Sequence, residues 1–200
     1  MNDVYFFTTA VIGDEGVGGC WNRIASLVPN KDDWIGIMDA DVMLFPHNWP
    51  DRVVQAINSE EGKEFAVITC MATRTYHKSD QQFHGETKYG VPIRELRDIV
   101  RLAEISERQF EIPNRGDITA PVIRMRTGFS AFFFVFKKSL WLKYPFPSVG
   151  IKGHKNVGVE TAWDRKIRKA GYRVGLIPSL LAVHYYRFNK HDRDATHLED

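Results

Sequence analysis

The most constraining feature of this 200-residue chain is a short apolar run that ends in two aspartates. The run, at 34–38, is bounded by polar residues, which is typical of a buried strand inside a parallel sheet. Asp39 and Asp41 follow it, separated only by Ala40. Ligands of open α/β sheets bind outside the carboxyl ends of strands, and carboxylates there suit Mg²⁺ or Mn²⁺ and, through the metal, a diphosphate. An acidic turn after a strand has the same signature, so the pair alone does not decide between the two.

Segments on either side of this run alternate between strand-like and helix-like patterns, which predicts an α/β fold. Strands are expected where β-branched and aromatic residues gather, at 4–9, 64–70, 122–125, 128–136, 172–177 and 180–185. Helices are expected at 19–28, 51–58, 92–103 and 159–170, with a short one from 137. The almost wholly apolar strand at 128–136 should be central. The polar stretch at 73–92 is interpreted as a long surface excursion.

Composition indicates one compact domain, because 44% hydrophobic residues suffice for a sizeable core. Cys20 and Cys70 lie in apolar surroundings without metal-type spacing, so we expect buried free thiols and a reducing compartment. The sequence shows no signal peptide and no apolar run long enough to cross a bilayer. We therefore expect a soluble, cytoplasmic protein without a transmembrane segment.

The net charge of +2 is unevenly spread. Residues 1–50 hold two Lys/Arg against seven Asp/Glu, whereas residues 101–200 hold eighteen Lys/Arg against ten Asp/Glu. The acidic first quarter suits a metal site. The basic second half suits an anionic partner such as a nucleoside diphosphate or a polyanionic acceptor, although a solvated basic face is the commoner reason for such a charge.

A glycine-rich segment at 12–19 follows the first expected strand, where a nucleotide would lie in an α/β fold. We interpret it as a loop in which Gly16, Gly18 and Gly19 permit close backbone approach to a ligand. The segment does not complete a Walker or dinucleotide fingerprint, so it points to a nucleotide only by position.

Four pieces of the chain, in order, resemble the metal-dependent glycosyltransferases of the GT-A fold, family-2 type, in a compact version like some bacterial and phage members. The first two are Asn22, similar to the family's asparagine on the helix before the metal strand, and Asp39-Ala40-Asp41. The third is Gly128-Phe129-Ser130 with the apolar strand and Lys137-Lys138-Ser139-Leu140-Trp141 after it, similar to the segment that borders sugar and acceptor.

The fourth piece is the most specific. In the family an acidic residue begins a helix, a glycine ends it, and a histidine closes the second strand beyond. Glu160, Gly171 and His184 stand at that spacing, and His184-Tyr185-Tyr186-Arg187 resembles the ending of compact members.

The resemblance implies a single GT-A-type (Rossmann-like) domain over 1–190, with a mixed, mostly parallel sheet flanked by helices and a charged tail at 191–200. It implies a hexosyltransferase-like enzyme that moves a sugar from a nucleoside-diphosphate sugar, a UDP-sugar first of all, to an acceptor hydroxyl. Inversion is favoured over retention, and retention stays open because an Asp-x-Asp site completed by a histidine also occurs in retaining relatives. Mn²⁺ or Mg²⁺ would be held by Asp41, Asp39 and His184. Glu160 would be the base, and the donor would contact Thr8, Asn22, Asp39, Asp41, Gly128 and Arg187.

The chain departs from the family at two places. The usual Glu-Asp pair is replaced by Val159-Glu160-Thr161, which leaves Asp164 as the next candidate base, and the second strand with its base-recognising aspartate has no counterpart. The nucleotide is therefore not fixed by the sequence. The acceptor is equally open: a glycan, a protein and a modified DNA base all remain.

Other interpretations of the same residues stay open. Glu160 could simply complement the dipole of its helix, His184 could be a hydrogen-bonded core histidine, and Arg187 a surface arginine. Three tryptophans could stack on a sugar, although the last is better suited to the core: Trp49, Trp141 and Trp163.

Rival classes are less well matched. A haloacid-dehalogenase-like phosphatase needs a threonine where Met43 stands, and a nucleotidyltransferase needs a signature loop that we do not find. A non-catalytic sugar- or nucleic-acid-binding module is favoured only by the basic second half.

Overall fold

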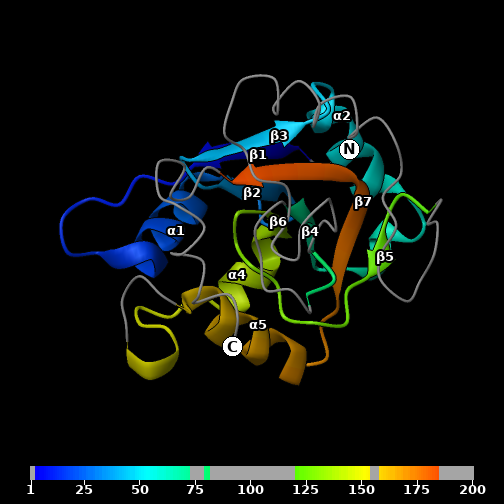
Figure 1. Ribbon diagram of the computed structural model, residues 1–200. Helices are drawn as coiled ribbons and strands as arrows, with labels where there is room; N and C mark the ends of the chain where they lie inside the picture. The colour runs from blue at the N-terminus through cyan, green and yellow to red at the C-terminus, as the bar shows by residue number, and fades with distance from the viewer. Residues whose placement is uncertain (1–2, 73–78, 82–119, 154–157, 185–200) are drawn as a thin grey trace.

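A computed structural model describes residues 3–72, 79–81, 120–153 and 158–184 of the protein (Figure 1). These residues form one mixed α/β unit around a curled seven-stranded sheet. The strands are β1 (Val4–Thr8), β2 (Trp34–Met38), β3 (Val42–Phe45), β4 (Val67–Ala72), β5 (Ile123–Arg124), β6 (Phe133–Lys137) and β7 (Val174–His184). The helices are α1 (Gly16–Leu27), α2 (Trp49–Asn58), α4 (Lys138–Lys143) and α5 (Val159–Lys169), with short 3₁₀ turns at Gly62–Glu64 and Ile151–Gly153.

The strand order is β1-β2-β6-β4-β7-β3, and β5 pairs with β7 off this path. β1 runs parallel to β2, and β4 parallel to β7. The other pairs are antiparallel, because β6 runs against both of its neighbours and β3 and β5 each run against β7. The α/β class and the mixed sheet are confirmed, but parallel pairing makes up a smaller share of the sheet than expected.

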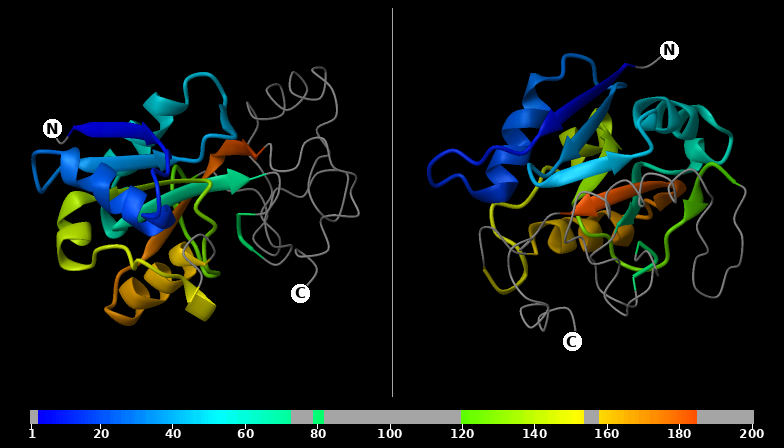
Figure 2. Two further views of the ribbon diagram at one scale, coloured as in Figure 1. Left: turned by 90° about the vertical axis from the view of Figure 1, so that its left-hand side faces the viewer. Right: turned by 45° about the horizontal axis from the view of Figure 1, so that its top comes forward.

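Helices cover both faces of the sheet (Figures 1 and 2). One core lies between the sheet and α1, α4 and α5, and a second lies between the sheet and α2. The sequence of β2 is apolar because the strand is buried on both faces: Ile35 and Ile37 pack in the first core, and Trp34 packs in the second. β6 divides its side chains in the same way, so the predicted central position of the 128–136 segment is confirmed for the part that forms β6.

Several elements differ from the predictions, and α1, β3 and β7 differ most in kind. α1 begins at Gly16 and not at residue 19, so Gly18 lies inside a helix. A Cβ there would sit 2.0 Å from the carbonyl oxygen of Pro147, which means that the close approach made by Gly18 is to the protein's own backbone. β3 was not expected as a strand.

The two strands expected around Pro178 are one strand, β7, whose pairing with β4 shifts register. Ile177 pairs with Cys70 and Leu181 with Met71, so residues 178–180 bulge out and the missing N–H of the proline breaks no ladder bond.

Several other predictions can now be placed. Cys20 and Cys70 are buried free thiols, as expected. Within the described part of the chain, no helix is both long and apolar enough to cross a membrane. The expected helix at 92–103, the charged tail at 191–200 and most of the polar stretch at 73–92 lie outside the described residues.

Candidate functional site

The carboxyl ends of β1 and β2 meet at one edge of the sheet because the two strands are parallel, with Thr8 opposite Met38. The next residues along the chain are therefore neighbours. The Thr9 amide donates to the Met38 carbonyl at 2.8 Å, and the Thr9 hydroxyl donates to Asp39 Oδ1 at 3.4 Å. On the other side of β2, the Asp39 amide donates to the Phe132 carbonyl at 2.9 Å.

A tight turn between β2 and β3 carries both aspartates. The Val42 amide donates to the Asp39 carbonyl at 3.2 Å, which closes a β-turn around Ala40 and Asp41. Asp39 is half-buried against the sheet, while Asp41 is exposed. The two carboxylates thus belong to the same turn but differ in burial.

Glu160 reaches this region from α5. The helix is preceded by Gly158 in the left-handed conformation (φ 72°), and Glu160 lies half-buried in its first turn. Burial raises the pKa of Glu160, although hydrogen bonds from its own amide and from Thr161 oppose the shift. The first-turn position also complements the helix dipole, so a structural role and a chemical one are compatible at this residue.

Asp39 is the carboxyl group with the most strongly raised pKa at this site. Burial, then the charge of Asp41, and further the charge of Glu160 raise the pKa of Asp39 to about 7, against the bond from Thr9. The charges of Asp41 and Glu160 therefore both act on Asp39, and the charge of Asp41 acts more strongly. These are three of the residues singled out in the sequence, and they come from two distant segments.

The donor set suits a cation that the protein shares with a ligand. Among the side chains that the structure describes, no group of three or more His, Cys, Asp or Glu is placed to hold a metal by itself. Mg²⁺ keeps several waters and is bound by one or two carboxylates together with phosphate oxygens. The pair Asp39 and Asp41 fits that mode of binding and does not form an all-protein metal cage.

The remaining predicted ligands are placed only in part. His184 closes β7 and its backbone pairs with Val42, the residue after Asp41, in the β3–β7 ladder. The side chain of His184 and all of Arg187 lie outside the described part of the chain. Thr8 is exposed at the end of β1, and it is the neighbouring Thr9 that contacts Asp39.

Asn22 has a structural role that the sequence comparison did not suggest. Its Oδ1 accepts hydrogen bonds from Trp141 Nε1 at 2.8 Å and from the Phe146 amide at 3.0 Å, and its Nδ2 donates to the Phe146 carbonyl at 3.0 Å. These bonds tie α1 to α4 and to the loop that follows it. Contact of Asn22 with a donor stays a prediction, but one side-chain N–H at most is left for it.

The segment from Met125 to Phe132, which we call the wall, contacts α5 through the carbonyls of Met125 and Thr127 and contacts Asp39 through the carbonyl of Phe132. Gly128 is exposed there, and a Cβ on it would lie 3.5 Å from Asp164 Oδ2. Asp164 is only 3% exposed and pairs with Arg168 at 2.7 Å, and Arg168 also donates to the carbonyls of Met125 and Thr127. Asp164, the alternative base, is therefore held in a structural ion pair. Burial raises its pKa, which Arg168 opposes.

Asp80 and Gln81 also hold this wall, and sequence reasoning missed both. Asp80 Oδ2 accepts from the Arg126 amide, and Gln81, only 1% exposed, accepts from the Ser130 amide through Oε1. The side-chain Nε2 of Gln81 also donates to Thr69 Oγ1 at 2.8 Å. Both residues stand in a polar stretch typical of a solvated loop, so no sequence signal would have found them.

The three tryptophans considered for sugar stacking differ in burial: Trp163 is buried, whereas Trp49 and Trp141 are partly exposed. Trp163 is fully buried, as expected of a core residue. Trp49 packs edge-on against Phe6, with ring centroids 4.7 Å apart, and Trp141 donates to Asn22.

Comparisons with known proteins add little. No protein-family model matches the chain, and no curated protein matches it. Among solved structures, the chain is similar to the inositol-1-phosphate CTP transferase from T. maritima, with a TM-score of 0.43, 10% identity, and coverage of 93% of this chain and 62% of that one. The chain thus spans less than two thirds of that protein, and a likeness of this size carries no argument about reaction or substrate.

Proposed function

We propose that the protein is a divalent-cation-dependent glycosyltransferase that moves a sugar from a nucleoside-diphosphate sugar to an acceptor hydroxyl with inversion. The observation that carries this proposal is the turn that places Asp39 and Asp41 at the carboxyl edge of β1 and β2, with Glu160 near enough for its charge to act on Asp39. Those residues belong to the motifs that resemble family-2 glycosyltransferases. This arrangement supports the resemblance, because residues from two motifs that are far apart in the sequence interact through their charges in the fold.

Asp41, with Asp39, would hold Mn²⁺ or Mg²⁺. When bound, the cation supplies positive charge that stabilises the departing diphosphate. The backbone bond to Phe132 holds the Asp39 main chain at the end of β2, and the Thr9 hydroxyl contacts one oxygen of its carboxylate. A UDP-sugar is the first donor to test.

Glu160 would accept the proton of the acceptor hydroxyl at a carboxylate oxygen. The acceptor oxygen forms its bond to the anomeric carbon as the bond from that carbon to the diphosphate oxygen breaks, and the proton passes to Glu160. A buried carboxylate with a raised pKa is better suited to this task near neutral pH than an exposed one. A single displacement needs only this one base, which is why inversion is proposed.

The acceptor defines two narrower forms of the proposal. A glycan or protein acceptor needs no special charge, whereas a modified DNA base would use the basic second half of the chain, and binding to DNA would then weaken steeply with salt. A non-catalytic sugar- or nucleic-acid-binding module is the competing class. It would bind without turnover.

The test is a thermal-shift screen of UDP, GDP and dTDP, each with Mn²⁺ and with EDTA, followed by assays for hydrolysis of the matching sugar nucleotide. The proposal expects one nucleotide to stabilise the protein only with Mn²⁺, and slow metal-dependent release of the sugar. Binding without turnover in any assay would favour the module. Stabilisation that is equal in EDTA would reject the assigned cation site.

A further inference from the structure

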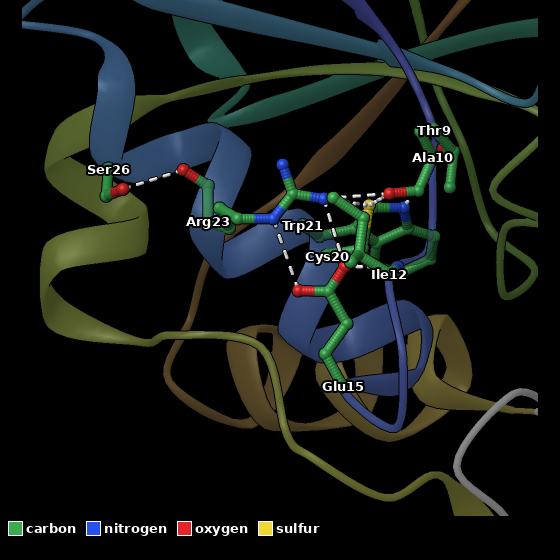
Figure 3. A network of polar contacts seen from close by, with 8 residues as sticks. All are labelled: Thr9, Ala10, Ile12, Glu15, Cys20, Trp21, Arg23 and Ser26. Atoms are coloured by element: carbon green, nitrogen blue, oxygen red, sulfur yellow. Dashed lines mark hydrogen bonds and ion pairs between the residues drawn. The ribbon is translucent and has the colours of Figure 1, made fainter.

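The loop between β1 and α1 lies beside the candidate site but has no hydrophobic anchor. Its residues Val11 and Ile12 are 44% and 64% exposed, and around Gly13 (φ +57°) no atom lies within 4 Å of where a Cβ would be. Burial therefore cannot hold this loop in one conformation. Figure 3 shows what does hold it: polar side chains from α1 and from the end of the loop itself.

Arg23 is the centre of this network (Figure 3). Its Nη2 donates to the Ala10 carbonyl at 2.7 Å and to Glu15 Oε1 at 3.0 Å, and its Nε donates to Glu15 Oε2 at 3.2 Å. Glu15 in turn accepts from the Ile12 amide at 2.8 Å. One guanidinium thus fixes the loop near its beginning directly and near its middle through Glu15.

The network extends to the candidate site through two further α1 residues. The Cys20 thiol donates to the Ala10 carbonyl at 3.3 Å, and Trp21 Nε1 donates to the Thr9 hydroxyl at 3.4 Å. That hydroxyl is the group that donates to Asp39. Arg23 and Asp39 are therefore connected through the backbone of only two loop residues, Thr9 and Ala10.

We propose that Arg23 is a positioning residue for the nucleotide, acting through the loop backbone and Glu15 without contact with the reacting atoms. This inference rests on the proposed function, since it concerns how the donor's nucleoside diphosphate is received. The physical reason is preorganisation: if the loop samples several conformations, the observed affinity falls by the fraction of molecules in the competent one.

Global stability should depend little on Arg23. The side chains of Arg23 and Glu15 are 41% and 21% exposed, and ion pairs of that exposure contribute little to folding. A functional effect can therefore be separated from a folding defect. The pair Arg173–Glu64 offers a matched control, because it is also exposed, with a 2.7 Å contact, and lies at the amino end of β7.

The experiment compares Arg23→Met, Arg23→Lys, Glu15→Gln and Arg173→Met by UDP calorimetry with Mn²⁺, thermal unfolding and amide exchange. Arg23→Met should raise the Kd of UDP by about tenfold, on the assumption that the competent fraction of the loop falls by that factor. Its unfolding temperature should stay within about 3 °C of wild type. Exchange should quicken at residues 10–12 and not elsewhere, and Arg23→Lys should restore part of the affinity.

The outcomes separate the inference from the function on which it rests. If wild type binds UDP with Mn²⁺ and Arg23→Met binds it equally tightly, Arg23 is not a positioning residue and the inference alone fails. If Arg173→Met weakens UDP binding as much as Arg23→Met does, the effect is general and the inference also fails. If wild type binds no nucleoside diphosphate with Mn²⁺, the proposed function fails and the inference fails with it.

Discussion

Asp39 is the residue at which the needs of folding and of the proposed chemistry conflict. It is half-buried beside two other carboxylates, and folding alone would favour a neutral side chain there. A raised folded-state pKa means that the folded protein binds this proton more tightly than the unfolded chain does. The stability contributed by protonated Asp39 is full below the ordinary pKa of 3.8 and is lost as the pH rises through about 7.

Asp39→Asn should therefore stabilise the metal-free protein, and more so at high pH. In EDTA, we expect a larger gain in unfolding temperature at pH 8.5 than at pH 5. Only at the higher pH does wild type carry a charged Asp39 that is penalised by burial and repelled by Asp41. Asp32→Asn, at an exposed turn position, serves as the control. An equal change at both pH values would show that Asp39 is not repelled by its neighbours.

Substitutions of Glu160 and of His184 are predicted to have different effects on binding and turnover. Glu160→Gln keeps the shape and removes the base, so turnover should fall by roughly 10²–10⁴-fold while binding of UDP and Mn²⁺ is retained. His184→Ala should weaken binding of the metal and the diphosphate as well as turnover. The measurement is steady-state turnover paired with calorimetry. A folded Glu160→Gln protein with wild-type turnover would remove Glu160 from the mechanism.

At the scale of elements, α5 contributes side chains to two different places along its length. Its first turn presents Glu160, and one turn later the Asp164–Arg168 pair holds the wall formed by Met125 to Phe132. The position of Glu160, the proposed base, relative to the wall is therefore set by contacts within one helix. That arrangement makes Asp164 a poor substitute for Glu160 in proton transfer.

Arg168→Met should destabilise the protein by about 3 kcal/mol, because it leaves the buried Asp164 carboxylate without its cation and two carbonyls without their donor. Urea unfolding measures the change. Arg168→Met combined with Asp164→Asn should be more stable than Arg168→Met alone, since the uncompensated charge is gone. A double variant that is the less stable of the two would contradict this account of the pair.

At the scale of the whole molecule, the features that were predicted correctly are those with a strong sequence pattern. β2 and β6 are buried on both faces, so their apolar runs were legible, and parallel pairing of β1 with β2 made the carboxyl edge predictable. The start of α1 was missed because glycines disfavour helices, whereas Gly18 is needed where α1 meets Pro147. The contacts of Asp80, Gln81 and Arg168 with the wall depend on tertiary structure alone, and no local pattern encodes them.

The binding of UDP with and without Mn²⁺, in wild type and in Asp41→Asn, shows whether the aspartates of the β2–β3 turn hold a cation together with a diphosphate. Asp41 is exposed, so its substitution should leave the fold intact, and Asp32→Asn again controls for loss of a surface charge. We expect wild type to bind UDP far more tightly with Mn²⁺ than in EDTA, and we expect Asp41→Asn to abolish this difference. Equal affinity with and without the metal in wild type, or an unchanged metal dependence in Asp41→Asn, would contradict this expectation.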